Sequence, residues 1–147
     1  MITRQDLQLL VDAAELADFN VNIDDLQLIQ WDAGHQTHRP IRLPRDFAAV
    51  YVFKWNDTYL KIGMVNTNSN ARYQTHHYNS SSSNSNLSKS IQNDPEFQAL
   101  LADADIGDWI KENTTRFNIL IPIELGKKFV QFTEAFFILK CNPMFEG

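Results

Sequence analysis

The stretch from Ala48 to Asn79 constrains the fold most, because it has the pattern of a hairpin followed by a helix. Residues 48–53 are apolar and rich in β-branched and aromatic side chains, which is typical of a mostly buried strand. Residues 55–58 (WNDT) favour a turn, since Asn and Asp side chains hydrogen-bond their own backbone. Residues 59–65 then have the pattern of a returning strand. The sequence therefore predicts an antiparallel pair of strands.

A helix is expected after this hairpin. Ser69 or Asn70 can cap a helix that runs through Arg72 to Tyr78. On such a helix Arg72 and His76 are four residues apart and share one face. The polar run that follows, residues 79–86 (NSSSSNSN), cannot bury apolar area and is expected to form a loop. That loop either reaches over a bound phosphate backbone or is a plain linker.

The rest of the C-terminal two-thirds alternates helical and extended patterns. Short helices are expected at residues 87–91, 94–101 and 106–111, a strand at 116–123 and a long closing helix at 127–140. There are too few strands for a doubly wound sheet, and no phosphate-binding glycine pattern follows either hairpin strand. The predicted class is α+β, with a small, mainly antiparallel three-stranded sheet flanked by helices and an N-terminal helical arm.

The N-terminal arm holds the clearest amphipathic helix, at residues 3–19. Thr3 can cap it with Asp6 at the third helical position. Its apolar set is Leu7, Leu10, Val11, Ala14 and, on the flank, Leu16. A second helical piece is expected from Asn22 or Asp24 through Leu26 and Ile29, and residues 34–44 are expected to be an extended linker. The chain thus divides into an arm with linker, 1–45, and a domain, 46–147. The arm either packs on that domain or forms a partner or dimer surface.

Three isolated residues favour structural interpretations. His35 and His38 fit a solvated loop better than a metal site, because no carboxylate or cysteine set stands beside them. The single cysteine, Cys141, excludes an internal disulfide, and its apolar neighbours favour a buried thiol over a nucleophile.

No run of apolar residues approaches the length of a membrane span, and the first ten residues lack a signal-peptide pattern. A soluble, cytoplasmic protein with no membrane partner is expected.

Charge and composition bound the partners. A hydrophobic fraction of 44% is ample for a packed core. The net charge of −5 opposes DNA binding unless the positive charge is gathered on one face, because phosphate contacts supply most non-specific affinity. Acidic residues dominate the arm. The basic residues of the remaining chain include Lys54, Lys61, Arg72, Lys89, Lys111 and Arg116.

Five short pieces occur in a fixed order along residues 48–147: Ala49-Val50-Tyr51, Lys61-Ile62-Gly63, Arg72 with His76, Thr133-Glu134-Ala135, and Asn142-Pro143. In this order they resemble the GIY-YIG nuclease superfamily over about two-thirds of the chain. Ala49 stands where the first glycine is usual. Lys61 stands where the second tyrosine is usual, as in some restriction-enzyme-like members. Each piece is unspecific alone, and the order is much more specific.

The resemblance implies a metal-dependent endonuclease that hydrolyses DNA phosphodiester bonds. It assigns Tyr51 to activating or orienting the attacking water. We then expect Lys61 to act as electrostatic partner or proton carrier. Lys61 can lower the pKa of Tyr51 across the hairpin by its charge. Arg72 is the expected clamp on a phosphate oxygen, since its planar fork matches that group. His76 can then shuttle the proton, with His77 as a secondary candidate.

The resemblance also assigns the metal. Glu134 would hold Mg²⁺ or another divalent cation, and a hard oxygen ligand among waters suits this ion. From the helix pattern alone, Glu134 is a solvent-facing glutamate or a partner of Arg72. Asn142 is a secondary candidate that either orders the C-terminal turn or hydrogen-bonds a site side chain. We expect Tyr51, Lys61, Arg72, His76 and Glu134 to converge on one pocket.

Two alternatives come from other arrangements of the same fold. The chain can be a nuclease-like module that is weakly active or inactive and binds nucleic acid or a protein partner. It can also be an enzyme that works as a homodimer or with a separate specificity subunit. A positive groove past Tyr51, Arg72 and Glu134 would favour the enzyme, and a negative groove would favour the module.

Overall fold

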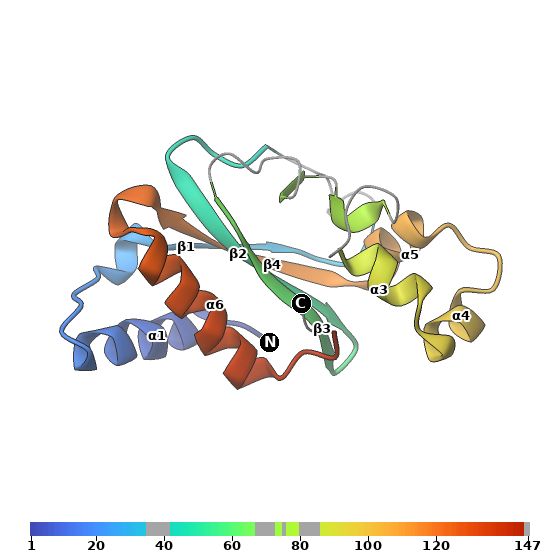
Figure 1. Ribbon diagram of the computed structural model, residues 1–147, viewed down its shortest axis with the longest axis horizontal. Coiled ribbons are helices and arrows are strands. Elements are labelled where there is room, and N and C mark those ends of the chain that lie inside the picture. The colour runs from blue at the N-terminus through green and yellow to red at the C-terminus, as the bar shows by residue number, and fades with distance from the viewer. Residues whose placement is uncertain (35–41, 67–72, 75, 80–85, 146–147) are drawn as a thin grey trace.

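One four-stranded antiparallel sheet, in the order β1-β4-β2-β3, forms the centre of the molecule (Figure 1). The computed structural model describes residues 1–34, 42–66, 73–74, 76–79 and 86–145. The expected class, α+β with a mainly antiparallel sheet, is confirmed. The strands are β1 (Gln27–Trp31), β2 (Phe47–Trp55), β3 (Thr58–Val65) and β4 (Thr115–Pro122).

The β2–β3 hairpin forms where the sequence predicts it. Its register pairs Ala49 with Val65 and Trp55 with Thr58, and one irregularity lies between Phe53 and Lys54. Asn56, at the turn, has a φ of 51°, a left-handed conformation that Asn tolerates better than most residues. The local turn chemistry is therefore what sets this register.

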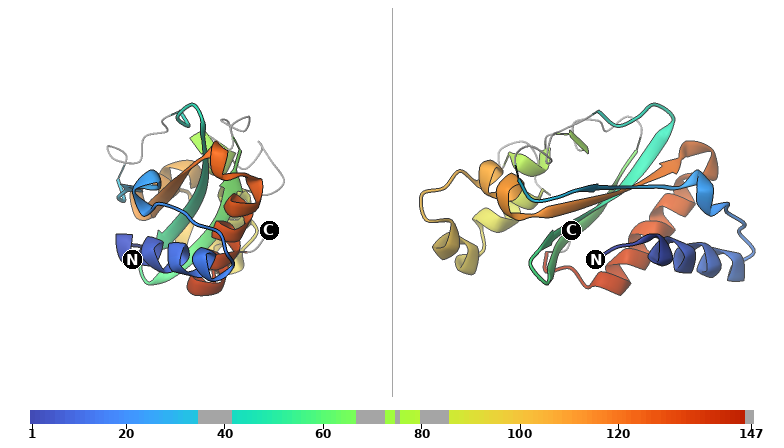
Figure 2. Two further views of the ribbon diagram at one scale, coloured as in Figure 1. Left: turned by 90° about the vertical axis from the view of Figure 1, so that its left-hand side faces the viewer. Right: turned by 180° about the vertical axis from the view of Figure 1, so that it is seen from behind.

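Two helices, α1 (Arg4–Leu16) and α6 (Lys127–Cys141), cover one face of the sheet (Figures 1 and 2). The cap expected at Thr3 is present, since the Asp6 carboxylate accepts from the Thr3 backbone N–H at 2.8 Å. Lys140 and Asp6 form an ion pair at 3.2 Å that joins the helices. Leu16, expected on the apolar flank, is 90% exposed. The core on this face contains Leu7, Leu10, Val11, Ala14, Val50, Val52, Ile62, Phe117, Ile119, Ile121, Phe129, Val130 and Phe137.

The second helical piece expected through Leu26 and Ile29 is wrong. Only a single turn, η1 (Ile23–Asp25), forms there, and its Asn22 cap accepts from Asp24 N–H at 3.0 Å. The chain then continues as β1, which pairs antiparallel with β4 and gives the sheet four strands where three were expected. The backbone hydrogen bonds that β4 offers along its open side stabilise a strand here more than the weak local pattern stabilises a helix. The arm and the domain therefore share one sheet, and the division at residue 45 stays a prediction.

The opposite face carries the helices α3 (Leu87–Gln92), α4 (Pro95–Leu101) and α5 (Ile106–Asn113), together with the turn η2 (His76–Tyr78). All three helices were expected, and polar side chains cap them. Asp94 accepts from Glu96 N–H at 3.0 Å, and Asp105 accepts from Asp108 N–H at 2.9 Å. Of the helix expected from Arg72 to Tyr78, only residues 73, 74 and 76–78 are described. His35 and His38, and most of the serine-rich run, lie outside the described residues.

The last described residues lie beside the edge strand β3. After the turn η3 (Ile123–Leu125), helix α6 runs to Asn142, whose φ of 47° is left-handed and whose backbone N–H bonds Ile138 O. Backbone N–H groups of Met144 and Phe145 then donate to Tyr59 O and Leu60 O, each at 2.8 Å. Asn142 is therefore the left-handed residue that ends α6, and its two expected roles stay predictions. None of the described helices is both long and apolar enough to cross a membrane.

Candidate functional site

Tyr51 and Gly63 lie directly opposite each other on β2 and β3. Tyr51 is fully buried, and its phenol lies over Gly63 so closely that a Cβ on Gly63 would overlap the hydroxyl oxygen. The backbone of Gly63 is not in the left-handed region, so this close approach is what requires glycine there. The hydroxyl of Tyr51 is therefore directed across β3, toward the edge of the sheet.

Lys61 shares this face with Tyr51. It pairs with Phe53, and alternate residues of a strand point to the same side, so Lys61 stands one pair from Gly63. Its side chain is only 1% exposed. A buried ammonium is costly unless it has a counter-charge or hydrogen bonds, which makes its position next to a phenol notable. The structure brings these two predicted residues together.

His77 also belongs to this group. Its ring centroid lies 4.2 Å from that of Tyr51, and its Nδ1 accepts from the Leu87 backbone N–H at 3.1 Å. Nδ1 is therefore unprotonated, and a neutral His77 carries its proton on Nε2. Arg72 and the side chain of His76 lie outside what the structure describes. The ranking of His76 above His77 stays a prediction, and His77 is the histidine observed against Tyr51.

Arg116 is the residue that sequence reasoning missed as part of this site. Its guanidinium carbon lies 4.7 to 5.4 Å from the centroids of four aromatic rings, and the side chain has no exposed surface. Nε donates to Asn118 Oδ1 at 2.8 Å, and Nη1 donates to the Tyr78 hydroxyl at 3.3 Å. The four rings belong to Trp31, Tyr51, Phe53 and Tyr73.

A signal for this arrangement was present in the sequence. Arg116 and Asn118 alternate with Phe117 and Ile119 in an apolar strand, and a period of two places both polar residues on one face.

Besides Tyr51, two tyrosines contact the guanidinium, Tyr73 and Tyr78. Burial raises the pKa of Tyr73 and that of Tyr78 above the ordinary tyrosine value, and the positive charge of Arg116 offsets part of each shift. Both phenols are therefore protonated at neutral pH. Cys141, by contrast, is half-buried on α6, and burial raises the pKa of its thiol, which accords with the inert role expected for it.

Glu134 is half-buried on α6. The inward residues of that helix, such as Val130 and Phe137, belong to the core on the other face of the sheet from Tyr51. A meeting of Glu134 with Tyr51 would take place at the β3 edge, which α6 crosses and toward which the phenol is directed. The convergence of all five residues stays a prediction, since Arg72 is not described.

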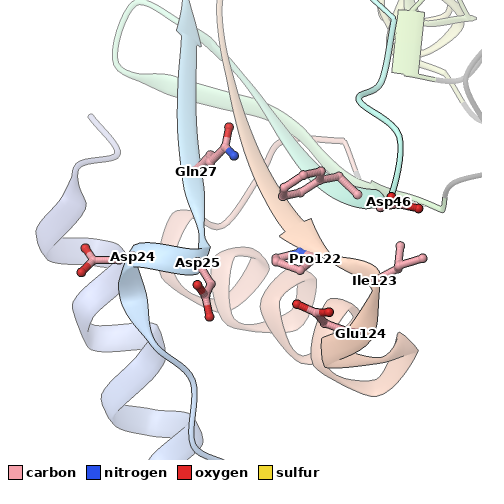
Figure 3. A pocket seen from close by; sticks show the side chains of 8 residues that line it. Asp24, Asp25, Gln27, Asp46, Pro122, Ile123 and Glu124 are labelled. Atoms are coloured by element: carbon pink, nitrogen blue, oxygen red, sulfur yellow. The ribbon is translucent and has the colours of Figure 1, made fainter.

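An acidic hollow of about 670 Å³ lies at the far end of the sheet (Figure 3). Its carboxylates, those of Asp24, Asp25, Asp46 and Glu124, point in different directions, and Asp24 is paired with Arg4 at 2.6 Å. Within the described ranges, no three His, Cys, Asp or Glu side chains form a group that could hold a metal ion. Acidity alone therefore does not make this hollow a metal centre.

Neither a scan of protein-family models nor searches of curated proteins and of solved structures found a match to this chain.

Proposed function

We propose that this protein is a metal-dependent endonuclease of the GIY-YIG type that hydrolyses phosphodiester bonds in DNA. The observation that supports it most is the face-to-face arrangement of the two half-motifs across the hairpin. Tyr51 rests on Gly63, with Lys61 one pair away on the same buried face. These are the residues that the resemblance to that superfamily singles out.

In this proposal Tyr51 takes a proton from the attacking water or orients that water. To take that proton Tyr51 must be a phenolate, and Lys61 stabilises the negative charge that the phenolate carries before the proton is transferred. Arg72 binds a non-bridging phosphate oxygen, and His76 returns a proton to the leaving group, with His77 as the alternative.

Glu134 would hold the divalent cation. A half-buried carboxylate on a helix suits one hard ion that keeps several waters. Bound Mg²⁺ would supply charge stabilisation to the phosphate in the transition state. The proposal includes a cytoplasmic location, with DNA as the substrate and either a homodimer or a separate specificity subunit as the working assembly.

One observation favours the alternative, a nuclease-like module that binds nucleic acid or a protein without cutting. Tyr51 and Lys61 are 0% and 1% exposed, and a group that activates water must meet both water and substrate. The enzyme therefore requires a movement that opens this face, whereas the module does not.

Incubation of supercoiled plasmid with the purified protein and Mg²⁺ tests the proposal. Glu134→Ala should abolish nicking, while Glu124→Ala, a matched change at an exposed glutamate near the start of α6, should leave it intact. Circular dichroism should show both variants folded. If the wild type and Glu134→Ala are equally inert while the wild type still binds DNA, the module replaces the enzyme.

A further inference from the structure

The Arg116 guanidinium carries a buried charge that no described acidic residue neutralises. Its hydrogen bonds go to the neutral groups of Asn118 and Tyr78, and no carboxylate in the described ranges forms an ion pair with it. Burying such a charge costs free energy, which aromatic rings and neutral acceptors offset only in part. A fold that needed this side chain for stability alone would be better served by a carboxylate partner or by an apolar residue.

The donors around Arg116 are also incompletely used. Arg116 Nη2, Asn118 Nδ2 and the Tyr73 hydroxyl are buried without a hydrogen-bond partner in the described structure. In a guanidinium, Nη2 points along the same edge as Nε–H, so Asn118 presents one acceptor to an edge that offers two donors. An aspartate at this position would satisfy both donors. Asparagine instead leaves the positive charge unneutralised.

Tyr51 is one of three tyrosines that lie against this charge, together with Tyr73 and Tyr78. Its ring centroid lies 5.4 Å from the guanidinium carbon, and ionisation of the phenol would make the ring a stronger partner for a cation. The other charged or titratable described groups on the elements that face Tyr51 are Lys61 on β3 and His77, Tyr73 and Tyr78 in the 73–78 segment. Tyr73 and Tyr78 are neutral at neutral pH, so they do not consume the charge of Arg116.

We propose that Arg116 is a positioning residue that holds an uncompensated positive charge against Tyr51, and that Asn118 is neutral so that this charge stays available to the phenolate. This role rests on the proposed function for its purpose, because a phenolate is useful only if Tyr51 takes a proton. The geometry behind it does not depend on DNA cleavage.

The variant Asn118→Asp separates this role from a structural one. It keeps the size of the side chain and should give Arg116 a bidentate partner, so its melting temperature should equal or exceed that of the wild type. The added negative charge should also raise the titration midpoint of Tyr51 by about one pH unit or more. Arg116→Met removes the charge and roughly keeps the length of the side chain, so it should also raise the titration midpoint of Tyr51.

Tyrosine labelled with ¹³C at Cζ reports these midpoints directly by NMR. The chain has four tyrosines, so four resonances can be assigned with single Tyr→Phe changes. Tyr59 serves as an internal control, because its nearby cation is Lys54, whose Nζ lies 5.5 Å from the Tyr59 ring centroid. The titration midpoint of Tyr59 should not change in either variant. Tyr73 and Tyr78 should shift upward with Tyr51, because both contact Arg116.

The proposal is overturned if Asn118→Asp leaves the Tyr51 midpoint unchanged, or if Tyr51 of the wild type stays protonated up to pH 11. Asn118→Asp decides the question even if Arg116→Met does not fold. The titration needs no DNA. If Asn118→Asp raises the titration midpoint of Tyr51 in a protein that cuts no DNA, the proposed function is refuted and the role of the charge stands. If the protein cleaves DNA but Asn118→Asp leaves the titration midpoint of Tyr51 unchanged, the role of the charge is refuted and the proposed function stands.

Discussion

Replacing Gly63 by alanine tests the contact that fixes Tyr51. The added methyl would overlap the hydroxyl oxygen and the adjoining ring carbon of Tyr51, and both residues are buried in a strand pair that cannot move aside freely. Overpacking of this kind costs about 1–3 kcal/mol. The backbone of Gly63 suits alanine, so the loss of unfolded-state entropy returns roughly 0.4–1 kcal/mol. The net destabilisation should be about 1–2 kcal/mol, or roughly 3–8 °C in melting temperature.

Urea unfolding of four proteins measures this effect: the wild type, Gly63→Ala, Tyr51→Leu and the double variant. Leucine lacks the ring atoms that the new methyl would meet, so in the Tyr51→Leu background Gly63→Ala should cost less than about 0.5 kcal/mol. An equal cost in both backgrounds would show that Tyr51 does not rest on Gly63, and the explanation of this glycine would be wrong. Gly63→Ala should also slow any cleavage about a hundredfold, since a displacement of about 1 Å is enough for such a loss.

Three further changes test other parts of the account. Arg72→Ala should cut the cleavage rate about a hundredfold or more if its side chain stabilises transition-state charge, with binding to uncut duplex measured alongside. Lys61→Tyr should lower activity and move the pH optimum upward if Lys61 acts on Tyr51 through its charge; an unchanged pH–rate profile would exclude that role. Tyr73→Phe should be neutral or stabilising at pH 7, because it removes a buried hydroxyl that has no partner in the described structure. Burial raises the pKa of Tyr73 when folded, so the unfolded chain releases this proton first and stability falls as pH rises above about 10. Tyr73→Phe should flatten that fall in thermal melts, and an unaltered slope would contradict the burial of an ionisable phenol.

Local signals predicted the elements that local chemistry determines. The hairpin turn at Asn56, the Thr3 cap with Asp6 and the start of α4 after Asp94 all depend on residues within four positions of one another. Such patterns can be recognised in a sequence because they do not depend on residues far away in the chain.

The elements that were missed depend on distant partners. Residues 27–31 became a strand because β4, more than 80 residues later, offered an unpaired edge. Arg116 became the centre of an aromatic cluster because three segments, β1, β2 and the one that holds Tyr73, meet around it, which its own neighbours do not reveal. The relation of Glu134 to Tyr51 likewise depends on how α6 crosses β3, a matter of helix–sheet geometry rather than of helix pattern.

The central claim is that Tyr51 carries out proton transfer in DNA hydrolysis. Single-turnover cleavage of end-labelled duplex DNA, with excess protein and Mg²⁺, tests it most directly when duplex binding is measured in the same buffer. The account predicts that Tyr51→Phe binds DNA as tightly as the wild type and cuts at least about a hundredfold more slowly. Equal cleavage rates for the two proteins, or a wild type that binds duplex and never cuts it, would contradict the claim.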